Sequence, residues 1–423
     1  MTEESDYYVL DRDLLPNYLG AIPKVVDALG LEAGFGADAI TIDEIGDGNL
    51  NFVYRVTNAS DDSKQVIVKQ AVPYLRMVGE EWPLSRDRMT YEIRALTIYN
   101  ETVPDLVPTI FHADEPMSTL VMQCLSDHII LRIGMIDAIT YPKVAEHVGL
   151  FMAETLFKTS AWAMPSEARR ELMDQFTMNA ELCKLTEEFI FTFPYMVHDS
   201  NYSNPATDAW AKENVHTDTA YKLDVLKLKD LFVAKTDALL HADLHTGSLM
   251  VNQDESYVID MEFAYFGPFG FDVGKVISNF LLACTSHFSR DGGVEYREWL
   301  IDQVPVIWNT FEKRFLELWA EVDESTMLTA GLLTSEETAT LRADFMTNLL
   351  RESAGFCACS MARRTLGIAG VADIRDIEDL DVRSQLEITN LQLSKRIMAE
   401  RNTLSSIDDL VAIVRDFYSS VAL

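Results

Sequence analysis

The 423-residue chain has few of the features that mark membrane-spanning proteins, secreted proteins or proteins with cysteine-based zinc sites. No apolar run approaches the roughly 18 residues that a spanning helix needs. Residues 1–6 lack the basic region and apolar core of a signal peptide. The five cysteines are odd in number and scattered, so they predict no disulfide framework, and Cys357 and Cys359 have no companion pair that would indicate zinc. We therefore expect a cytoplasmic protein.

Basic residues are also scarce. The chain has 35 lysines and arginines against 67 acidic residues, a formal net charge of −32. A charge of this sign repels nucleic acid and anionic membrane surfaces, so we expect neither as a partner. Hydrophobic residues, in contrast, make up 48% of the chain, which over this length is enough to bury one extended core or two moderate cores.

The most informative stretch runs from residue 241 to residue 262. It reads His-Ala-Asp-Leu-His-Thr-Gly-Ser-Leu-Met-Val, then a polar turn, then Tyr-Val-Ile-Asp-Met-Glu. We expect Asp243 to be an exposed carboxylate in a polar loop, and Asp260 and Glu262 to end an apolar strand. Acids at positions i and i+2 share one face of an extended segment, so both can reach one hard cation. This pattern suits phosphoryl transfer, in which one carboxylate orients the attacking hydroxyl and others hold magnesium.

Supporting residues precede this stretch at suitable distances. Gly46 and Gly48 come before a strand-like run, and two close glycines let backbone N–H groups approach a phosphate. Lys69 is expected at the end of a strand over residues 65–69, where it can reach phosphate oxygens as a point charge. Glu92 lies on a predicted helix over residues 85–96; pairing with Lys69 and a plain surface position fit the sequence equally. In this order the residues together predict a phosphotransferase.

Three groups of residues allow a second interpretation. His241 and His245 flank Asp243, and His-x-Asp-x-His also occurs in zinc hydrolases, but we interpret the histidines as hydrogen-bonding groups that order the loop. Asp272 precedes an apolar helix and is a natural N-cap. Arg363 and Arg364 fit the last turn of a helix before Gly367, where basic residues are common.

Taken together, the motifs resemble those of the methylthioribose kinase family, within the protein-kinase-like and aminoglycoside phosphotransferase-like superfamily. The matching segments are residues 46–53, 68–74, 80–84, 241–248, 260–264 and 270–274, together with Arg363 and Arg364. Ala242 and Met261 depart from the glycine and proline of the family pattern, but neither change removes a functional group. The resemblance implies ATP-dependent phosphorylation of 5-methylthioribose at its anomeric hydroxyl, in methionine salvage, by a homodimer.

The resemblance also implies a fold and a set of residue roles. The fold is α+β and bilobal: a small lobe over residues 1–122 with an antiparallel sheet and a helical lead-in at about residues 1–35, a link over residues 123–126, and a mostly helical lobe over residues 127–423. Arg363 and Arg364 then bind the sugar, Asp243 binds its hydroxyl and is the catalytic base, and Asp260 and Glu262 hold Mg²⁺. The residues expected to bind ATP are Gly46, Gly48, Asn49, Asn51, Lys69, Gln123, Cys124, Leu125, Asp260, Met261 and Glu262. Structural support is expected from Glu92, His241, His245 and Asp272.

Several alternatives stay open at this stage. A kinase of the same fold could act on an aminoglycoside, choline or homoserine, and a silent nucleotide-binding scaffold or a zinc hydrolase are further possibilities. Ser248 stands where protein kinases carry a metal-binding asparagine, which leaves the number of metal ions open. Residues 193–219, rich in Pro, Asn and Asp, are either a surface excursion or a substrate lid. A hairpin is expected over residues 110–114 and 118–125, and a last helix from Ser406 with Asp409 in a capping box.

Overall fold

The computed structural model describes residues 7–45, 50–75, 79–201, 204–290 and 292–421. The chain divides into two compact units. The first comprises Met1–His128 and Ile259–Ala264, and the second comprises Ile129–Val258 and Tyr265–Leu423. The lobe boundaries expected from the sequence lie close to this division, but residues 259–264 were expected in the second lobe. The α+β class is confirmed, because one unit is built on an antiparallel sheet and the other mainly on helices.

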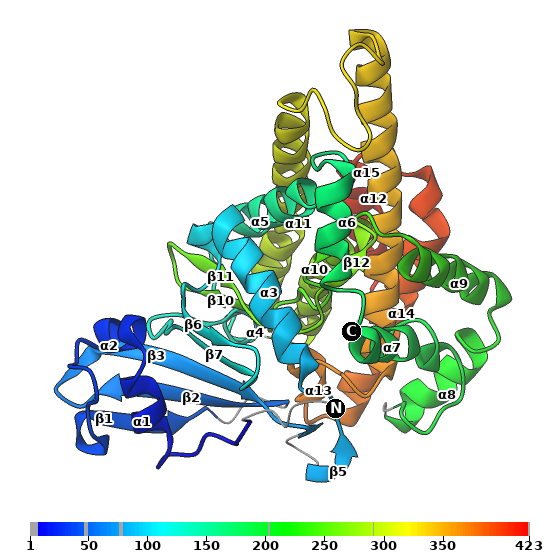
Figure 1. Cartoon of the computed structure of the whole chain (residues 1–423). Helices are drawn as coiled ribbons and strands as arrows, with labels where there is room; N and C mark the ends of the chain where they lie inside the picture. Colours follow the sequence, from blue (N-terminus) through cyan, green and yellow to red (C-terminus); the bar gives the residue numbers. More distant parts are fainter. Residues whose placement is uncertain (1–6, 46–49, 76–78, 202–203, 291, 422–423) are drawn as a thin grey trace. The chain divides into compact units, whose positions relative to one another are not determined.

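The first unit is built on a five-stranded antiparallel sheet with the strand order β1-β2-β3-β7-β6 (Figure 1). Pairing of β6 with β7 confirms the predicted hairpin, and two short helices confirm the helical lead-in. The strands are β1 (Ile40–Glu44), β2 (Asn51–Asn58), β3 (Asp61–Ala71), β4 (Tyr74–Leu75), β5 (Gly79–Pro83), β6 (Ile110–Asp114) and β7 (Thr119–Gln123). The helices are α1 (Leu15–Gly20), α2 (Pro23–Leu29), α3 (Asp87–Thr102) and the 3-10 turns η1 (Ala37–Ala39) and η2 (Pro104–Leu106).

The two faces of strand β3 have different neighbours, because successive side chains of a strand alternate. Val66 and Val68 belong to a buried cluster with leucines of α1 and α2. Lys69 points to the other face, toward α3. The expectation that the strand ends at Lys69 is wrong, since β3 continues to Ala71. Lys69 is therefore held inside the sheet, between neighbouring strands β2 and β7.

The second unit is mostly helical, with short strands in two small sheets of order β11-β10-β8 and β12-β9. Its helices are α4 (Leu131–Ile136), α5 (Val144–Lys158), α6 (Ser166–Asp174), α7 (Ala180–Phe189), α8 (Pro205–Asn214), α9 (Thr219–Ala234), α10 (Gly270–Ser286), α11 (Gly293–Ala320), α12 (Ser335–Leu366), α13 (Ala372–Arg375), α14 (Leu380–Glu400) and α15 (Ile407–Ser419). The 3-10 turns are η3 (Phe193–Tyr195), η4 (His287–Ser289) and η5 (Arg401–Thr403). The strands are β8 (Ile129–Ile130), β9 (Ala238–Leu240), β10 (Leu249–Val251), β11 (Ser256–Val258) and β12 (Tyr265–Gly267).

Two local predictions are decided in this unit. Ser406 and Asp409 form a capping box at the start of α15, which confirms the predicted start of the last helix. Residues 193–219 contain η3 and α8, so they are not one long irregular loop. Asn204 caps α8, and the side chains of Asn204 and Thr207 contact Glu387 of α14 at 3.1 and 2.5 Å. This part of the segment is thus packed against α14; its role as a lid stays a prediction.

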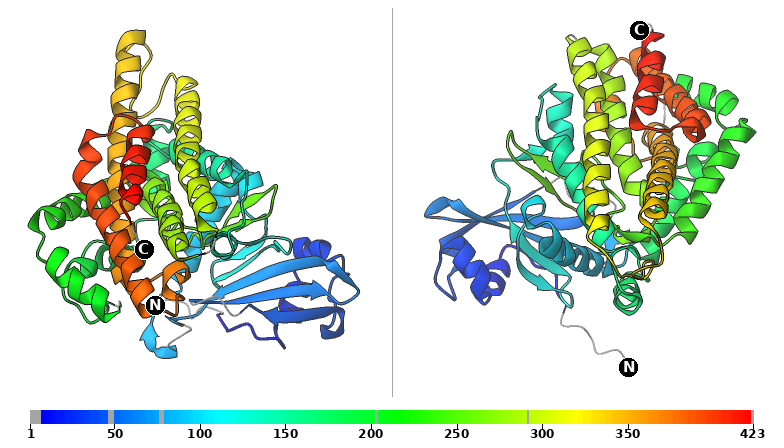
Figure 2. Two further views of the ribbon diagram at one scale, coloured as in Figure 1. Left: turned by 180° about the vertical axis from the view of Figure 1, so that it is seen from behind. Right: turned by 90° about the horizontal axis from the view of Figure 1, so that it is seen from above.

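Helix α10 is the central helix of the second unit, and each of its residues is buried. It packs against α11, α12 and α14 (Figure 2). Gly274 permits the close approach of α12, because a Cβ atom there would lie 2.4 Å from the carbonyl oxygen of Ser353 and 2.7 Å from the nitrogen of Cys357. The backbones of α10 and α12 are therefore in direct contact at this position.

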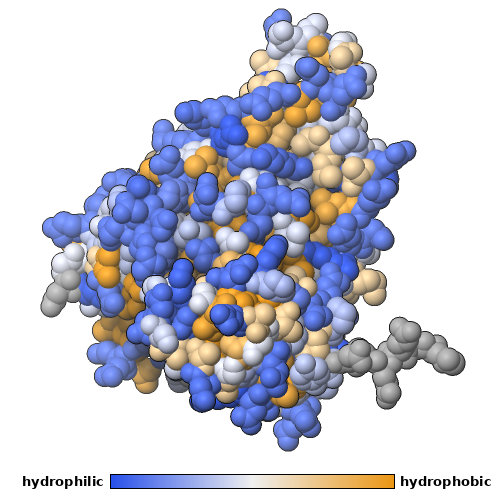
Figure 3. All heavy atoms as spheres, turned by 60° about the vertical axis from the view of Figure 1, so that its left-hand side comes forward, coloured by the Kyte–Doolittle hydropathy of each residue, from blue (hydrophilic) through white to orange (hydrophobic). Residues whose placement is uncertain are grey.

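Among the described helices, none combines the length and apolar composition needed to cross a membrane. Hydrophilic side chains cover much of the face drawn in Figure 3, with apolar groups between them. Most of the buried charged side chains among the described residues gather in two clusters described below, with Glu387 and Arg401 outside them. The position of each buried charge is therefore informative.

We expect Gly274→Ala to lower the free energy of unfolding by about 1–3 kcal/mol, because the added methyl group meets backbone atoms that cannot move independently. Calorimetric unfolding of the full chain measures the change. Gly36→Ala is the matched control, since a Cβ atom at Gly36 meets nothing within 4 Å and its φ is −88°. Equal melting temperatures for the two variants would contradict close packing at Gly274.

Candidate functional site

In the first unit, Lys69 is the centre of a buried cluster of charged groups. Its Nζ atom lies 2.8 Å from a carboxylate oxygen of Glu92 on α3 and 2.5 Å from Oδ1 of Asp260. The sequence left Glu92 either paired or on the surface, and the structure places it in a buried ion pair with Lys69. Two acids hold the ammonium group of Lys69 in one position. Such a fixed position is needed if the lysine is to contact a phosphate as a point charge.

Asp260 and Glu262 converge by a bend and not by strand alternation. Strand β11 ends at Val258, Asp260 has a left-handed φ of 72°, and Glu262 lies in a turn. The expectation of an extended segment that places both acids on one face is therefore wrong. The bend leaves the Asp260 side chain 45% exposed, whereas Glu262 is buried. Met261 between them is buried and packs in the core.

Glu262 is held by two residues from other elements. The side-chain amide of Asn51 donates to Oε2 of Glu262 at 3.1 Å, and Arg88 Nε donates to Oδ1 of Asn51 at 3.1 Å. Arg88 Nε also lies 3.7 Å from Glu262. Asn51 was predicted to bind ATP as part of the glycine-rich loop, but its side chain is hydrogen-bonded to Glu262 and Arg88. The predicted ligands Gly46, Gly48 and Asn49 lie outside the described residues.

The carboxylate cluster has the chemistry of a divalent-cation site. Oxygen atoms of Glu92, Asp260 and Glu262 all lie within 4.8 Å of one another. Burial, with the nearby charge of Asp260 and of Glu92, raises the pKa of Glu262 to about 8. Burial likewise raises the pKa of Glu92, against the opposing effect of Lys69. A bound cation would relieve this repulsion among acids, and clustered carboxylates are the ligands that Mg²⁺ prefers.

The predicted adenine contacts follow β7. Gln123 is the last residue of the strand, Cys124 is half-buried and Leu125 is buried. The backbone N–H of Gln123 donates to Thr109, and the carbonyl of Leu125 accepts from His128. The N–H of Gln123 is thus already bonded, whereas the carbonyl of Leu125 keeps a second lone pair for another donor.

In the second unit, the loop that carries Asp243 is held by Asp272. The Asp272 carboxylate accepts the backbone N–H groups of His241 and Ala242 at 2.8 and 3.0 Å. Asp272 lies inside the first turn of α10, which begins at Gly270, so its prediction as an N-cap is wrong. Ala242 has a left-handed φ of 63°, a conformation that costs roughly 1–2 kcal/mol for a residue with a Cβ atom. The backbone bonds from Asp272 hold the loop in this unfavourable conformation.

Asp243 is less accessible than the sequence suggests. Its side chain is only 17% exposed, so the expectation of an exposed carboxylate is wrong. Nζ of Lys275 lies 2.5 Å from its Oδ1 atom, and Arg363 and Arg364 lie 3.8 and 3.7 Å from the same atom. Burial alone would raise the pKa of Asp243, but Lys275, His245 and Arg364 hold it well below its usual range. Asp243 is therefore an ionised hydrogen-bond acceptor at neutral pH.

The two histidines order the loop by hydrogen bonds. Nδ1 of His241 accepts the backbone N–H of Asp243 at 3.2 Å, and Nδ1 of His245 accepts that of Gly247 at 2.8 Å. Burial lowers the pKa of His245 well below its usual value, so its ring is neutral. Because Nδ1 is an acceptor, the proton of the neutral ring lies on Nε2, 3.3 Å from Oδ2 of Asp243. His245 thus donates to the second oxygen of Asp243.

The predicted arginine pair stands in the last turn of α12, which ends at Leu366. Arg364 also donates to the carbonyl of Ala369 at 3.2 Å. Within the part of the chain that the structure describes, Nε of Arg363 and both Nε and Nη2 of Arg364 are buried without a hydrogen-bond partner. Buried guanidinium donors without partners are costly, which makes them suited to bind an oxygen-rich ligand.

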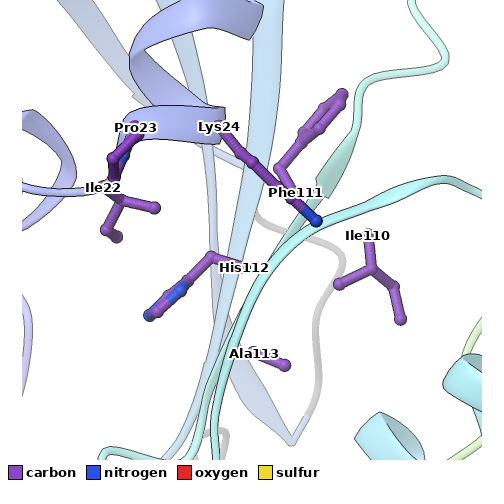
Figure 4. Close-up of a pocket in the computed structure, with 7 residues that line it drawn as sticks. All are labelled: Ile22, Pro23, Lys24, Ile110, Phe111, His112 and Ala113. Carbon is purple, nitrogen blue, oxygen red and sulfur yellow. The ribbon is translucent and has the colours of Figure 1, made fainter.

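A pocket elsewhere in the first unit holds none of these residues. Figure 4 shows its lining side chains, which come from the start of α2 and from β6: Ile22, Pro23, Lys24, Ile110, Phe111, His112 and Ala113. Its polar side chains are Lys24 and His112 only, with no acid that could hold a cation. We do not assign it to the candidate site.

Comparisons with known proteins agree with this geometry. Residues 41–303 match the family described as "Phosphotransferase enzyme family". "Methylthioribose kinase 1" of Oryza sativa subsp. japonica is 39% identical over 420 residues, which cover 96% of this chain and 95% of the relative. "Methylthioribose kinase" of Geobacillus kaustophilus is 38% identical over 396 residues, covering 92% and 94%. The chain belongs to the methylthioribose kinase family.

The wider fold of this family appears among solved structures at low identity. A structure titled "Glucosamine kinase (crystal form B)" is 12% identical, covers 90% of this chain and 85% of its own, and has a TM-score of 0.50. A likeness at this identity concerns the fold alone. It agrees with the kinase-like fold that the sequence motifs predict. The chain is a small-molecule kinase because of its similarity to the methylthioribose kinases and to the phosphotransferase family.

Sequence reasoning missed three residues of the two clusters. Lys275 is a charge inside an otherwise apolar helix, a signal that was visible three positions after Asp272. Arg88 lies one helical turn before Glu92 and could have been found from that spacing. Arg132, which donates to Thr246 and lies 3.4 Å from His245, has no local signal, because it comes from an element more than 100 residues away.

We expect Asp272→Asn to lower the free energy of unfolding by about 1–3 kcal/mol, because the amide turns a donor toward one of two buried backbone N–H groups. Thermal unfolding measures the change. Asp254→Asn is the control: this acid is 80% exposed and forms a surface pair with Lys143, so a change within about 0.5 kcal/mol is expected. If Asp272→Asn melts like Asp254→Asn, Asp272 does not hold the loop.

Proposed function

We propose that the protein transfers the γ-phosphoryl group of ATP to the anomeric hydroxyl of 5-methylthioribose, giving S-methyl-5-thioribose 1-phosphate. The observation that carries the proposal is the convergence of Arg363 and Arg364 on Asp243. An ionised carboxylate beside guanidinium groups that keep unbonded N–H donors among the described residues suits a hydroxyl acceptor that becomes a phosphate ester. Full-length similarity to methylthioribose kinases supports this choice of acceptor.

Groups of the first unit are assigned to the nucleotide and the metal ion. Lys69 contacts phosphate oxygens, Glu92 fixes its position, and Asp260 and Glu262 hold Mg²⁺. When bound, the cation neutralises charge on the phosphates. Asn51 keeps Glu262 in place, and the backbone around Cys124 and Leu125 is assigned to adenine. Gly46, Gly48 and Asn49 are proposed to cradle the phosphates, as the family motif implies.

Groups of the second unit are assigned to the acceptor. Asp243 accepts a hydrogen bond from the anomeric hydroxyl and takes its proton as the new oxygen–phosphorus bond forms and the bond to the leaving ADP breaks. Its lowered pKa keeps it ionised, although it also makes the carboxylate a weak base. Positioning and charge stabilisation must therefore supply most of the rate enhancement.

The acceptors of other kinases with this fold fit the second unit less well. Choline and aminoglycosides are cations, and Lys275, Arg363 and Arg364 would repel them. The proposal further includes a cytoplasmic location, which is the expectation from the sequence, and a role in methionine salvage and a homodimer, which are taken from the family resemblance.

A turnover assay with ATP and Mg²⁺ tests the function. It compares 5-methylthioribose with ribose, choline, homoserine and an aminoglycoside, and it identifies the product by phosphorus NMR. We expect turnover with 5-methylthioribose alone, loss of turnover with EDTA, and recovery with added Mg²⁺. Turnover of a different acceptor would overturn the substrate while keeping the kinase reaction, and activity that survives EDTA would overturn the metal assignment.

We expect Asp243→Asn to lower kcat by about 10²–10⁴-fold, the usual contribution of a proton acceptor. Affinity for ATP, measured by titration calorimetry, should stay within about twofold, because the nucleotide groups are assigned to the first unit. Asp254→Asn, an exposed acid of the same unit, serves as the control and should keep the parental kcat. A kcat for Asp243→Asn within a few-fold of the parent would rule out Asp243 as the base.

A further inference from the structure

Lys275 is a buried ammonium group in the centre of the second unit. It lies on α10, whose residues are all buried, and its side chain is 1% exposed. Besides the contact with Asp243, its Nζ atom donates to the backbone carbonyl of Ala242 at 2.9 Å. Burying an ammonium group costs several kcal/mol, and an apolar side chain would fill the same space without that cost. A lysine at this buried position therefore indicates a function that offsets the free-energy cost of burying its charge.

The contacts of Asp243 are divided between its two oxygens. Lys275 has the shortest contact with Oδ1, and Arg363 and Arg364 face the same oxygen from α12. Among the described residues, neutral His245 is the group that contacts Oδ2, at the longer distance of 3.3 Å. Of the other charged groups nearby, Arg132 of α4 and Asp373 of α13 pair with each other at 3.3 Å, and Asp272 of α10 accepts the backbone N–H groups of His241 and Ala242. Oδ2 therefore keeps acceptor capacity that Oδ1 has lost.

Lys275 also acts on the backbone that presents Asp243. Ala242 is in the left-handed region, with its N–H bonded to Asp272 and its carbonyl bonded to Lys275. Both residues lie in the first two turns of α10. The peptide groups on either side of Ala242 are thus both hydrogen-bonded to side chains of one rigid helix. Lys275 in addition contacts the Asp243 side chain.

We propose that Lys275 is a positioning residue for phosphoryl transfer: it holds Oδ1 of Asp243, keeps the carboxylate ionised, and so turns Oδ2 toward the acceptor hydroxyl. The inference rests on the proposed role of Asp243 as base. Lys275 acts through Asp243 and is given no contact with the sugar.

The ionisation of the two groups agrees with this role. Burial, together with Arg363 and Arg364, lowers the pKa of Lys275 to about 8, against the opposing effect of Asp243. Lys275 is therefore charged at pH 7 and holds the pKa of Asp243 down. Removing the ammonium group leaves Asp243 with a higher pKa, so more alkaline conditions are needed to ionise it. The acidic limb of the pH–rate profile must then move to higher pH.

The test measures kcat, KM for both substrates and the pH profile of kcat/KM for Lys275→Met in the full chain. We expect kcat to fall by about tenfold or more. The acidic limb should move up by about one pH unit or more, the usual effect of removing a close opposite charge from a carboxylate. KM for ATP should change by less than about twofold. Lys235→Met is the matched control: this lysine directly follows α9 and pairs with Glu352, away from the Asp243 loop, and its loss should leave the pH profile unchanged.

Two further variants separate charge from packing and keep the test decisive if Lys275→Met does not fold. Lys275→Gln can donate a hydrogen bond but has no charge, so its acidic limb should stay shifted. Lys275→Arg restores the charge, so its limb should return toward the parental position. The proposal is overturned if Lys275→Met and Lys275→Gln keep the parental pH profile. It is also overturned if the Lys275 variants change only in stability, by as much as Lys235→Met does.

Failure of this proposal is distinguishable from failure of the proposed function. If the parent phosphorylates 5-methylthioribose and Asp243→Asn abolishes turnover, parental pH profiles for the Lys275 variants refute the positioning role alone. If the parent phosphorylates another acceptor instead, the same variants are compared on that acceptor, and a shifted limb supports Lys275 while the substrate assignment fails.

Discussion

The packing of α10 against α12 is the contact on which the second unit depends. Gly274 brings the two backbones together, and this places the end of α12, with its two arginines, beside the first turns of α10. The same turns hold the Asp243 loop through Asp272 and Lys275. A buried helix is a rigid support, so the loop is positioned by the core and does not depend on loop stiffness.

The two clusters of buried charge differ in sign, and the difference indicates what each can bind. Around Lys69, burial and the nearness of the acids to one another raise the pKa of Glu262 and of Glu92, so the cluster favours an added cation that would stabilise the ionised carboxylates. Around Asp243, one carboxylate faces Lys275, Arg363 and Arg364, while His245 is neutral, so this cluster favours added negative charge. A divalent ion would relieve the repulsion in the first cluster, and a developing phosphate ester would offset the positive charge of the second. This complementarity explains why a chain with a net charge of −32 can use an anionic cosubstrate.

Two residues in the candidate site have strained backbone conformations. Ala242 and Asp260 are two of only four non-glycine residues with positive φ among those described, and each departs from the extended backbone that the sequence motifs favour. At Ala242 the family pattern has glycine, which takes this conformation without cost. The compensating hydrogen bonds from Asp272 and Lys275 show how this chain keeps the loop geometry with alanine.

Much of the site was predictable because its residues lie in short motifs with a fixed order: Lys69 in a strand, Asp243 in a polar loop, Asp260 and Glu262 after an apolar run, and two arginines at a helix end. Their local settings were predicted less well. The strand passes Lys69, Asp272 lies inside its helix, and the two metal acids meet through a bend, because each detail depends on hydrogen bonds to distant segments.

The sequence by itself determined the family, the α+β class and the identity of the chemical groups, since these follow from residue types and their order. Only the tertiary structure decided which charges face one another. The pairing of Lys69 with Glu92 and with Asp260, and of Asp243 with Lys275 and the arginines, joins residues 23 to 191 positions apart. Such pairings follow from the packing of whole elements, which no local pattern in the sequence encodes, and they set both the ionisation and the orientation of the groups on which function depends.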